Sequence, residues 1–253
     1  MPVDARRTSV HLEGLEYLMP VRDVPQIGSP YFEATTRRLL LQALPKGGVF
    51  VDVGAHVGTM ALPAARHVGP GGRVHAVEPA PANAATLAEN AELNGLANIT
   101  VHSCAAGAEA DTRPFHLMDF SFLNGFVQHG LGQPVATVEV PVRRLDELID
   151  ERVDVVKIDV EGAELDVLAG MSGLFERNPE MVLCVEWNPL TMNGRDPLLL
   201  LDALAEFGYR NGEVVEETNR GRRRPLEHAW PAIAAGRMPP NWWGNLIVRK
   251  EAP

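Results

Sequence analysis

The sequence has few cysteines and no long uninterrupted apolar stretch. Its two cysteines, Cys104 and Cys184, stand far apart and form no CxxC pair. Neither a disulfide framework nor a cysteine zinc site is therefore indicated, and a reducing, cytoplasmic compartment is expected. No window approaches the roughly 18 apolar residues of a membrane helix, and residues 1–20 have no apolar core behind their charges. We expect neither a membrane span nor an export signal.

Basic residues are also scarce. The chain of 253 residues carries 23 Lys and Arg against 33 Asp and Glu, a formal net charge of -10. Because binding to nucleic acid depends on clustered Lys and Arg, this balance argues against a nucleic-acid partner. Hydrophobic residues make up 45% of the chain and no repeat interrupts it, which predicts one domain over 1–253 with a full core.

Strands and helices are expected to alternate along most of the chain. Apolar runs bounded by turn residues predict strands at 49–53, 73–78, 99–104, 135–142, 153–160 and 181–185. Helices are expected before Pro45 and at 58–68, 81–93, 143–149, 162–170 and 196–207. This alternation predicts an α/β fold with a mostly parallel, doubly wound sheet. Two last strands near 209–215 and 244–249, joined by a loop, predict an antiparallel edge.

The stretch VFVDVGAHVGTM, residues 49–60, runs from a strand through a glycine turn into a helix. In a doubly wound sheet this turn usually supports a nucleotide at the carboxyl ends of the strands. Gly54 permits the tight turn and Gly58 allows close packing of the next helix, although such turns also occur without a ligand. Glu78 ends the second strand, where it can accept both ribose hydroxyls of an adenosine, in NAD or in S-adenosylmethionine.

Asp52 and His56 favour S-adenosylmethionine over a dinucleotide. A carboxylate at Asp52, beside the loop, opposes a pyrophosphate and attracts an ammonium or sulfonium group. The imidazole of His56 stands where a dinucleotide loop needs bare backbone, and we assign it no catalytic role. Capping of backbone amides at the strand ends is the alternative for Asp52 and Glu78.

Three charged residues close the strand predicted at 153–160. Lys157, Asp159 and Glu161 alternate, so an extended strand would point all three to one face. Charges in an apolar strand must pair or meet a ligand. A structural ion pair is as good an interpretation of Lys157 as a functional one, whereas Asp159 and Glu161 are expected to be functional. With Glu186 at the next strand's end they could also hold Mg2+, although nothing in their spacing requires it.

The loop DVGAHVGT, the segment AVEPAPANAATLAENAELNG and above all VVKIDVEGAELDVLAG followed by VLCVEWNP resemble the FkbM-type S-adenosylmethionine-dependent methyltransferases, over about residues 30–190. The resemblance implies a Rossmann-like class I fold. It also implies methyl transfer to oxygen, commonly on sugars, polyketides or other secondary metabolites, with some members esterifying carboxylates. The segment PYFEATTR further implies that Glu33 and Thr35 touch the amino-acid end of the cofactor.

The expected site follows from these assignments. Cofactor-binding residues are expected at Glu33, Thr35, Asp52, Gly54, Ala55, Gly58, Glu78, Pro79, Ser103 and Asp159. The expected catalytic set is Lys157, Asp159, Glu161 and Glu186, with no metal required. Asp159 or Glu161 would orient or deprotonate an acceptor hydroxyl while Glu186 shapes the pocket.

The expected activity is O-methylation of a hydroxyl on a small molecule, a sugar or secondary metabolite, with S-adenosylmethionine as donor. Methylation of a carboxylate and a non-catalytic S-adenosylmethionine-binding module are the alternatives. A nicotinamide dehydrogenase would keep Glu78 but fits Asp52 and His56 poorly. The oligomeric state is left open.

The single domain is expected to comprise an N-terminal segment and helix (1–45), a cofactor-binding core (46–190) and a C-terminal edge (191–253). Residues 107–134 interrupt the core as a substrate-side insertion or a hairpin. Phe120, Phe122 and Phe126 there would close over a substrate or form a small core. Weaker signals are the histidines His116, His129 and His228, candidate bases by residue type alone, the basic run 219–225, expected to be a solvated loop, and Trp230, Trp242 and Trp243, expected to pack.

Overall fold

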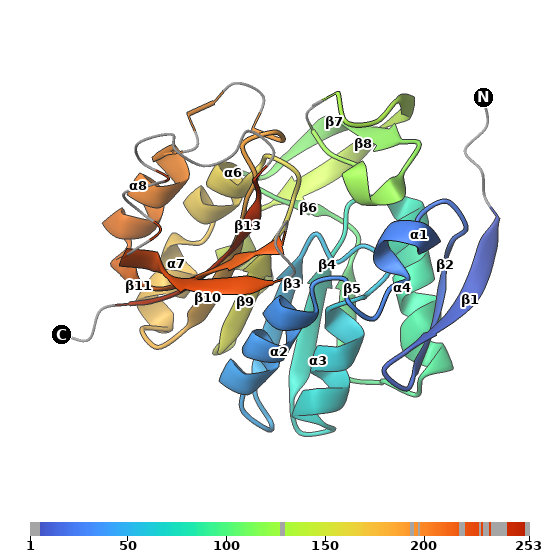
Figure 1. The fold of residues 1–253 in the computed structure, drawn as a ribbon, viewed down its shortest axis with the longest axis horizontal. Coiled ribbons are helices and arrows are strands. Elements are labelled where there is room, and N and C mark those ends of the chain that lie inside the picture. Colours follow the sequence, from blue (N-terminus) through green and yellow to red (C-terminus); the bar gives the residue numbers. More distant parts are fainter. Residues whose placement is uncertain are drawn as a thin grey trace.

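A central eight-stranded sheet organises the chain in the computed structural model (Figure 1). The structure describes residues 6–126, 130–192, 195–196, 198–217, 221–227, 229, 233 and 242–250. Across the sheet the order is β12 (Arg222–Pro225), β11 (Tyr209–Glu216), β13 (Gly244–Lys250), β10 (Val182–Trp187), β9 (Val155–Ile158), β3 (Val49–Val53), β4 (Arg73–Val77) and β5 (Ile99–His102).

Five neighbouring strands, from β5 to β10, are parallel. The predicted antiparallel edge is confirmed, because β13 runs against both of its neighbours and lies between β10 and β11. The strand order turns back at β3, whose neighbours are β4 and β9. Ligands of doubly wound sheets bind where the order reverses, at the carboxyl ends of the strands.

Helices cover both faces of this sheet (Figure 1). One face packs against α2 (Ala34–Ala43), α3 (Ala61–Val68) and α4 (Pro81–Leu93). The other packs against α5 (Leu145–Leu148), α6 (Glu164–Ala169), α7 (Ser172–Arg177) and α8 (Leu198–Glu206). Side chains of β3 point to both faces of the sheet: Phe50 packs in the core on the first face, and Val51 and Val53 pack in the core on the second.

Several predicted boundaries are corrected. Helix α3 begins at Ala61 rather than at Gly58, whose φ of 94° is left-handed. Strand β9 ends at Ile158 rather than at Val160, and β5 ends at His102 rather than at Cys104.

The N-terminal segment is more ordered than its loose sequence pattern predicts. Strands β1 (Arg7–Leu12) and β2 (Leu15–Pro20) form a hairpin, followed by the short helix α1 (Val24–Ile27). Glu13 and Gly14 form its two-residue turn, both with positive φ as a type I′ turn requires. The hairpin lies against α4, where the side chain of Asn90 exchanges two hydrogen bonds with the backbone of Leu18.

The interruption at 107–134 contains a hairpin, one of its two predicted forms. Strands β7 (Asp111–Met118) and β8 (Pro134–Arg143) pair antiparallel beside the short strand β6 (Ala105–Ala106). The 3-10 helix η1 (Ser121–Leu123) follows β7. In Figure 1 this layer stands at the top, above the carboxyl ends of the central strands.

The basic run is only partly a loop, contrary to expectation. Residues 222–225 form β12, and Arg223 and Arg224 pair with Glu213 and Glu216 on β11. His129, His228 and Trp230 lie outside the described residues, as do 218–220.

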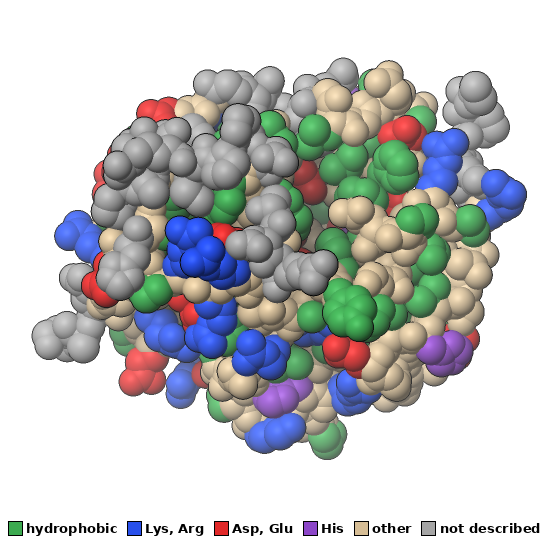
Figure 2. Space-filling model, in the orientation of Figure 1, with side chains coloured by type: hydrophobic (Ala, Val, Ile, Leu, Met, Phe, Trp, Pro, Cys, Tyr) green, Lys and Arg blue, Asp and Glu red, His purple; other side chains and the backbone are tan. Residues whose placement is uncertain are grey.

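Hydrophobic and basic side chains gather on different parts of one face of the molecule. Figure 2 shows the hydrophobic ones on the side that carries α1 and β2, and Lys and Arg nearer α2 and β11. Tyr31, just after α1, is 86% exposed, and Val21 and Phe120 are also exposed. Among the described residues, no helix combines the length and apolar character needed to cross a bilayer.

Candidate active site

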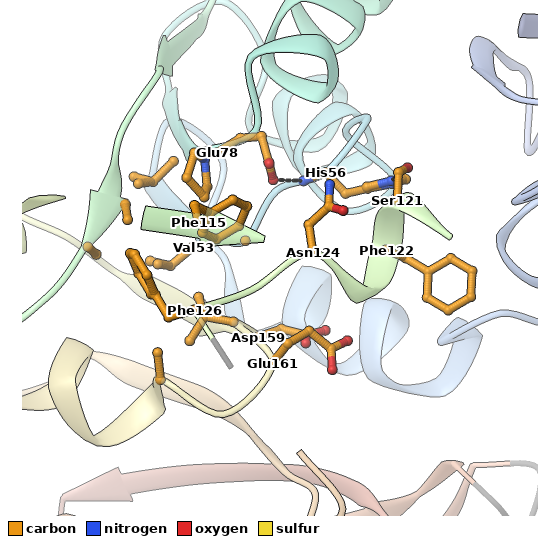
Figure 3. Close-up of a pocket in the computed structure, with 17 residues that line it drawn as sticks. Val53, His56, Glu78, Phe115, Ser121, Phe122, Asn124, Phe126, Asp159 and Glu161 are labelled. Carbon is orange, nitrogen blue, oxygen red and sulfur yellow. Dashed lines mark hydrogen bonds between the residues drawn. The ribbon is translucent and has the colours of Figure 1, made fainter. Parts of the chain in front are cut away.

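Two adjoining pockets open at the carboxyl ends of β3, β4, β9 and β10, and Figure 3 shows the residues that line the first. Their empty space, including the open mouths, is about 510 and 980 Å3. The first adjoins β4 and the β7–β8 layer, and the second adjoins α1, β10 and Trp243. Residues shared by both pockets are Gly54, His56, Phe122, Asp159 and Glu161.

The glycine turn after β3 passes very close to the end of β9. Gly54 has a φ of 85°, and a Cβ built on it would lie 1.8 Å from the carbonyl oxygen of Asp159. Only glycine fits there. The backbone N–H groups of Gly54 and Ala55 donate to Val77 O at 2.9 and 3.1 Å, which fixes the turn against β4.

Glu78 follows β4 and accepts one backbone hydrogen bond on each carboxylate oxygen. His56 N donates to Oε2 at 2.8 Å and Ala80 N donates to Oε1 at 2.9 Å (Figure 3). The side chain is 4% exposed, and burial raises its pKa to about 7 despite these bonds. The Asn83 side chain adds a further hydrogen bond, and the carboxylate keeps one lone pair that suits the predicted role as ribose ligand.

Asp52 lies beneath the turn rather than in either pocket. It is 1% exposed, and neither carboxylate oxygen has a hydrogen-bond partner among the described residues. Burial raises its pKa to about 7, although the positive charge of Lys157 opposes the shift. Direct contact with the cofactor therefore stays a prediction, and what the geometry offers is a negative charge behind the loop.

Lys157 joins two carboxylates from distant segments. Its Nζ lies 2.7 Å from Asp159 Oδ2 and 3.6 Å from Glu33 Oε2, and the residue is 3% exposed. Burial disfavours its charge, but these carboxylates outweigh burial and hold the pKa of Lys157 well above its ordinary value. The ion pair considered for Lys157 is thus present and lines the second pocket.

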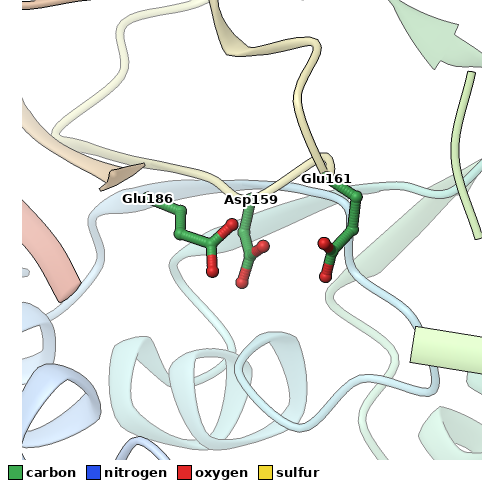
Figure 4. Close-up of side chains that lie close together, drawn as sticks. All are labelled: Asp159, Glu161 and Glu186. Atoms are coloured by element: carbon green, nitrogen blue, oxygen red, sulfur yellow. The ribbon is translucent and has the colours of Figure 1, made fainter. Parts of the chain in front are cut away.

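Three carboxylates that line the second pocket lie close together, and we call them its floor (Figure 4). Oxygens of Asp159, Glu161 and Glu186 all lie within 4.8 Å of one another. Burial, followed by the repulsion of Asp159, raises the pKa of Glu161 and of Glu186 well above the usual range. Contrary to expectation, Glu161 does not continue the extended strand. It follows β9 with a left-handed φ of 55°.

The same three carboxylates offer the oxygen ligands that Mg2+ accepts. In that respect they fit the metal alternative. Asp159, however, already receives the ammonium of Lys157 at 2.7 Å, which supplies a positive charge at that oxygen. A metal role stays an alternative to the metal-free site.

Of the other residues predicted to bind the cofactor, some line a pocket and some do not. Pro79 lines the first pocket, whereas Ser103 is exposed and lines neither. Thr35 lines a separate surface hollow beside Arg38. Ala55 and Gly58 are buried in the turn, where a Cβ on Gly58 would lie 2.2 Å from Leu62.

Aromatic residues of the insertion form a wall of the first pocket. Phe115 and Phe126 meet edge to face, with ring centroids 5.2 Å apart, and Phe122 reaches both pockets. Phe120 lines neither. His116 bonds to Thr137 at 3.1 Å instead of facing a pocket.

The C-terminal tryptophans differ from each other. Trp242 packs on Trp187 with ring centroids 5.0 Å apart, as expected, whereas Trp243 lines the second pocket, which the packing interpretation did not anticipate.

Asp23 and Ser121 were not singled out in the sequence, yet both meet His56. His56 Nε2 lies 2.6 Å from Ser121 Oγ, which lies 2.5 Å from Asp23 Oδ2. An aspartate before a four-residue helix and a serine that opens a 3-10 helix carry no local signal, so only the fold reveals this contact.

Comparisons with known proteins agree with this geometry. The family described as "Methyltransferase FkbM domain" matches residues 52–211. The chain is 32% identical to "Methyltransferase 1" of Beauveria bassiana over 50% of this chain and 59% of that one. It is 34% identical to "31-O-demethyl-FK506 methyltransferase FkbM" of Streptomyces tacrolimicus over 56% of this chain and 67% of that one. The chain thus spans about three fifths of the first of these relatives.

Solved structures show the same fold at low sequence identity. TYW2 of P. horikoshii in complex with MeSAdo superposes with a TM-score of 0.54 at 14% identity, covering 97% of this chain and 71% of that one. TYW2 of M. jannaschii in complex with AdoMet gives 0.51 at 16% identity, covering 97% and 87%. These likenesses concern the fold alone.

Proposed function

Because the chain belongs to the FkbM methyltransferase family, we propose that it methylates a hydroxyl group of a largely apolar small molecule. The chain is an S-adenosylmethionine-dependent methyltransferase. One of its relatives is named as a methyltransferase of 31-O-demethyl-FK506. The class of acceptor is the proposed part.

The residues that line the two pockets suggest how the cofactor would lie. Glu78 would hold the ribose, the apolar slot formed by Phe115, Phe126 and Ala106 would hold the adenine, and the loop at Gly54 would pass beneath the rest. When bound, S-adenosylmethionine supplies an electrophilic methyl group on a positively charged sulfur. The carboxylates of the half-buried Asp159 and the buried Glu33 would stabilise that charge through space.

The acidic floor of the second pocket is the observation that carries the choice of hydroxyl over carboxylate. Glu33, Asp159, Glu161 and Glu186 line this pocket, and the one Lys or Arg among its lining residues, Lys157, is already paired. A carboxylate acceptor would add a further negative charge to a cluster whose members already repel one another, since Asp159 helps to raise the pKa of Glu161 and of Glu186. A neutral hydroxyl meets no such penalty and can donate a hydrogen bond to the floor.

The walls of this pocket are mainly apolar. Leu131 and Leu190 are 46% and 41% exposed at its mouth. Apolar side chains that line it are Ile27, Phe32, Phe122, Leu123, Leu131, Leu190 and Trp243. Such walls suit an acceptor whose carbon skeleton is apolar around the hydroxyl.

Glu161 is the proposed base. It lies where the two pockets meet, between the proposed donor and acceptor sites. As the hydroxyl oxygen bonds to the methyl carbon and the methyl–sulfur bond breaks, leaving a neutral thioether, the hydroxyl proton would pass to the Glu161 carboxylate. A raised pKa makes Glu161 a stronger base than an ordinary carboxylate once it is ionised. Asp159, held by Lys157, would fix the geometry in which donor and acceptor meet.

The test uses protein incubated with methyl-labelled S-adenosylmethionine and cell extract, followed by solvent extraction and treatment with alkali. A methyl ether survives alkali, whereas a methyl ester releases labelled methanol. We expect alkali-stable label in the organic phase, lost with Glu161→Gln and kept with Glu92→Gln, a matched exposed control on α4. Labelled methanol would support the carboxylate alternative. Cofactor binding without transfer to any acceptor would support the non-catalytic module.

A further inference from the structure

Three side chains from distant segments meet beside the cofactor loop. Asp23 precedes α1, His56 lies in the loop after β3, and Ser121 opens η1 in the insertion. Asp23 accepts two hydrogen bonds from Ser121, from Oγ at 2.5 Å and from the backbone N at 3.2 Å. Ser121 Oγ also lies 2.6 Å from His56 Nε2. We call Asp23, Ser121 and His56 the latch.

The hydrogen-bond directions within the latch follow from the donors available. A serine hydroxyl has one proton, and the nearby carboxylate of Asp23 takes it because charged acceptors form the stronger bond. Ser121 Oγ must therefore accept from His56, so the imidazole carries its proton on Nε2. Burial lowers the pKa of His56 to about 4, which keeps the ring neutral and in this single tautomer near neutral pH.

The latch also explains why position 56 carries histidine rather than glycine. His56 has a φ of 50°, a conformation that glycine adopts freely and other residues adopt at a cost of about 1–3 kcal/mol. Asp23 is fully buried, although burial raises its pKa and so disfavours its charge. Glycine at position 56 would avoid the backbone cost, but it would lose the bond to Ser121.

Its position connects the latch to both sides of the cofactor pocket. The backbone N of His56 donates to Glu78, the proposed ribose ligand. Ser121 lines the first pocket, and the next residue, Phe122, lines both. The side chain of Asn83 adds a contact to Ser121 O at 3.4 Å. Fixing Ser121 therefore fixes the aromatic wall and the loop with respect to each other.

We propose that Asp23 and Ser121 are positioning residues of the cofactor site. They hold the imidazole of His56 and tie the insertion across the bound cofactor, so that the wall and the ribose carboxylate are already in place when the cofactor arrives. The latch then controls how tightly S-adenosylmethionine and its product S-adenosylhomocysteine are held and how fast the product leaves. Such an arrangement lowers the ordering cost of binding.

The test measures S-adenosylhomocysteine binding by calorimetry and its dissociation by stopped flow. Loss of one charge-assisted bond is expected to raise Kd roughly tenfold in Ser121→Ala and Asp23→Asn, mostly through faster dissociation. His56→Gly keeps the backbone conformation and the bond to Glu78 but removes the ring, so it should match Ser121→Ala. The control Ser172→Ala removes a serine hydroxyl bonded to Asp146, far along the chain, and should bind as wild type.

Combining substitutions separates positioning from general destabilisation. If one latch connects the residues, His56→Gly with Ser121→Ala should lose no more affinity than either alone. Losses that multiply in the double variant would overturn the proposal. So would wild-type Kd in Ser121→Ala and His56→Gly, or an equal loss in Ser172→Ala. If one variant fails to fold, Asp23→Asn and His56→Gly still give the answer, judged by melting temperature without ligand.

Discussion

Replacing Glu78 by glutamine tests the cofactor site most directly. At pH 8, above its pKa of about 7, the free carboxylate is largely ionised. Its oxygens accept two backbone N–H groups and a side-chain hydrogen bond from Asn83, which leaves one of the four lone pairs for a ribose hydroxyl. A hydrogen bond to a charged acceptor contributes about 1.5–3 kcal/mol, and glutamine keeps only one neutral acceptor. The expected loss is about 3 kcal/mol, or roughly a 100-fold rise in Kd.

Calorimetric titration at pH 8 with S-adenosylhomocysteine and with its 2′-deoxyadenosine analogue gives the decisive comparison. Wild type should lose affinity for the deoxy ligand, whereas Glu78→Gln should discriminate much less between the two, because its contact is already impaired. Glu92→Gln on the exposed side of α4 controls for the chemical change. A Kd within threefold of wild type, or undiminished discrimination against the deoxy ligand, would refute the reasoning.

Three further predictions follow from the site. Gly54→Ala should lower the melting temperature far more than Gly69→Ala, since both have left-handed φ but only the first places a Cβ against a carbonyl oxygen; equal effects would contradict this. Treatment with EDTA should leave turnover within about twofold because a lysine already pairs with Asp159; a tenfold loss would favour Mg2+. Without ligand, the melting temperature should fall between pH 6.5 and 8, because the buried carboxyls whose pKa is raised lose their protons in this range and become charged inside the protein. A rise would contradict this. Carboxyls with pKa raised to about 7 are Asp52, Glu78 and Glu164.

The parallel core was predictable because its signals are local. Each central strand is an apolar run next to a turn residue, and Pro81 and Gly95 mark the two ends of α4. The reversed strand was predictable from the long connection before it. Its place between β10 and β11 was not, because sequence patterns do not specify which strands become neighbours.

The N-terminal hairpin was missed although part of its signal is present. Leu15, Tyr17 and Met19 alternate with less buried residues, and all three are buried. The turn residue Glu13, however, has a positive φ that asparagine or glycine would normally adopt. Docking on Asn90 of α4, which no local pattern indicates, supplies the missing partner.

The predicted acidic site was assembled by a partly wrong argument. Alternation along a strand was expected to bring Lys157, Asp159 and Glu161 to one face, but β9 ends at Ile158. Lys157 and Asp159 do pair, whereas Glu161 reaches the pocket through a left-handed turn that precedes Gly162. Only glycine fits at position 162 in this turn, because a Cβ there would lie 2.2 Å from Thr191 O.

Backbone strain marks the site more sharply than residue type does. Among the described residues, four other than glycine have positive φ, and three of them, Glu33, His56 and Glu161, line the second pocket. A positive φ usually goes with glycine, so other residues at these positions conflict with the local sequence pattern. The fold compensates with specific partners: Lys157 faces Glu33 and Ser121 holds His56. Strain of this kind persists only where surrounding contacts enforce it. At His56, the contact of the ring with Ser121 therefore offsets the cost of the left-handed backbone conformation.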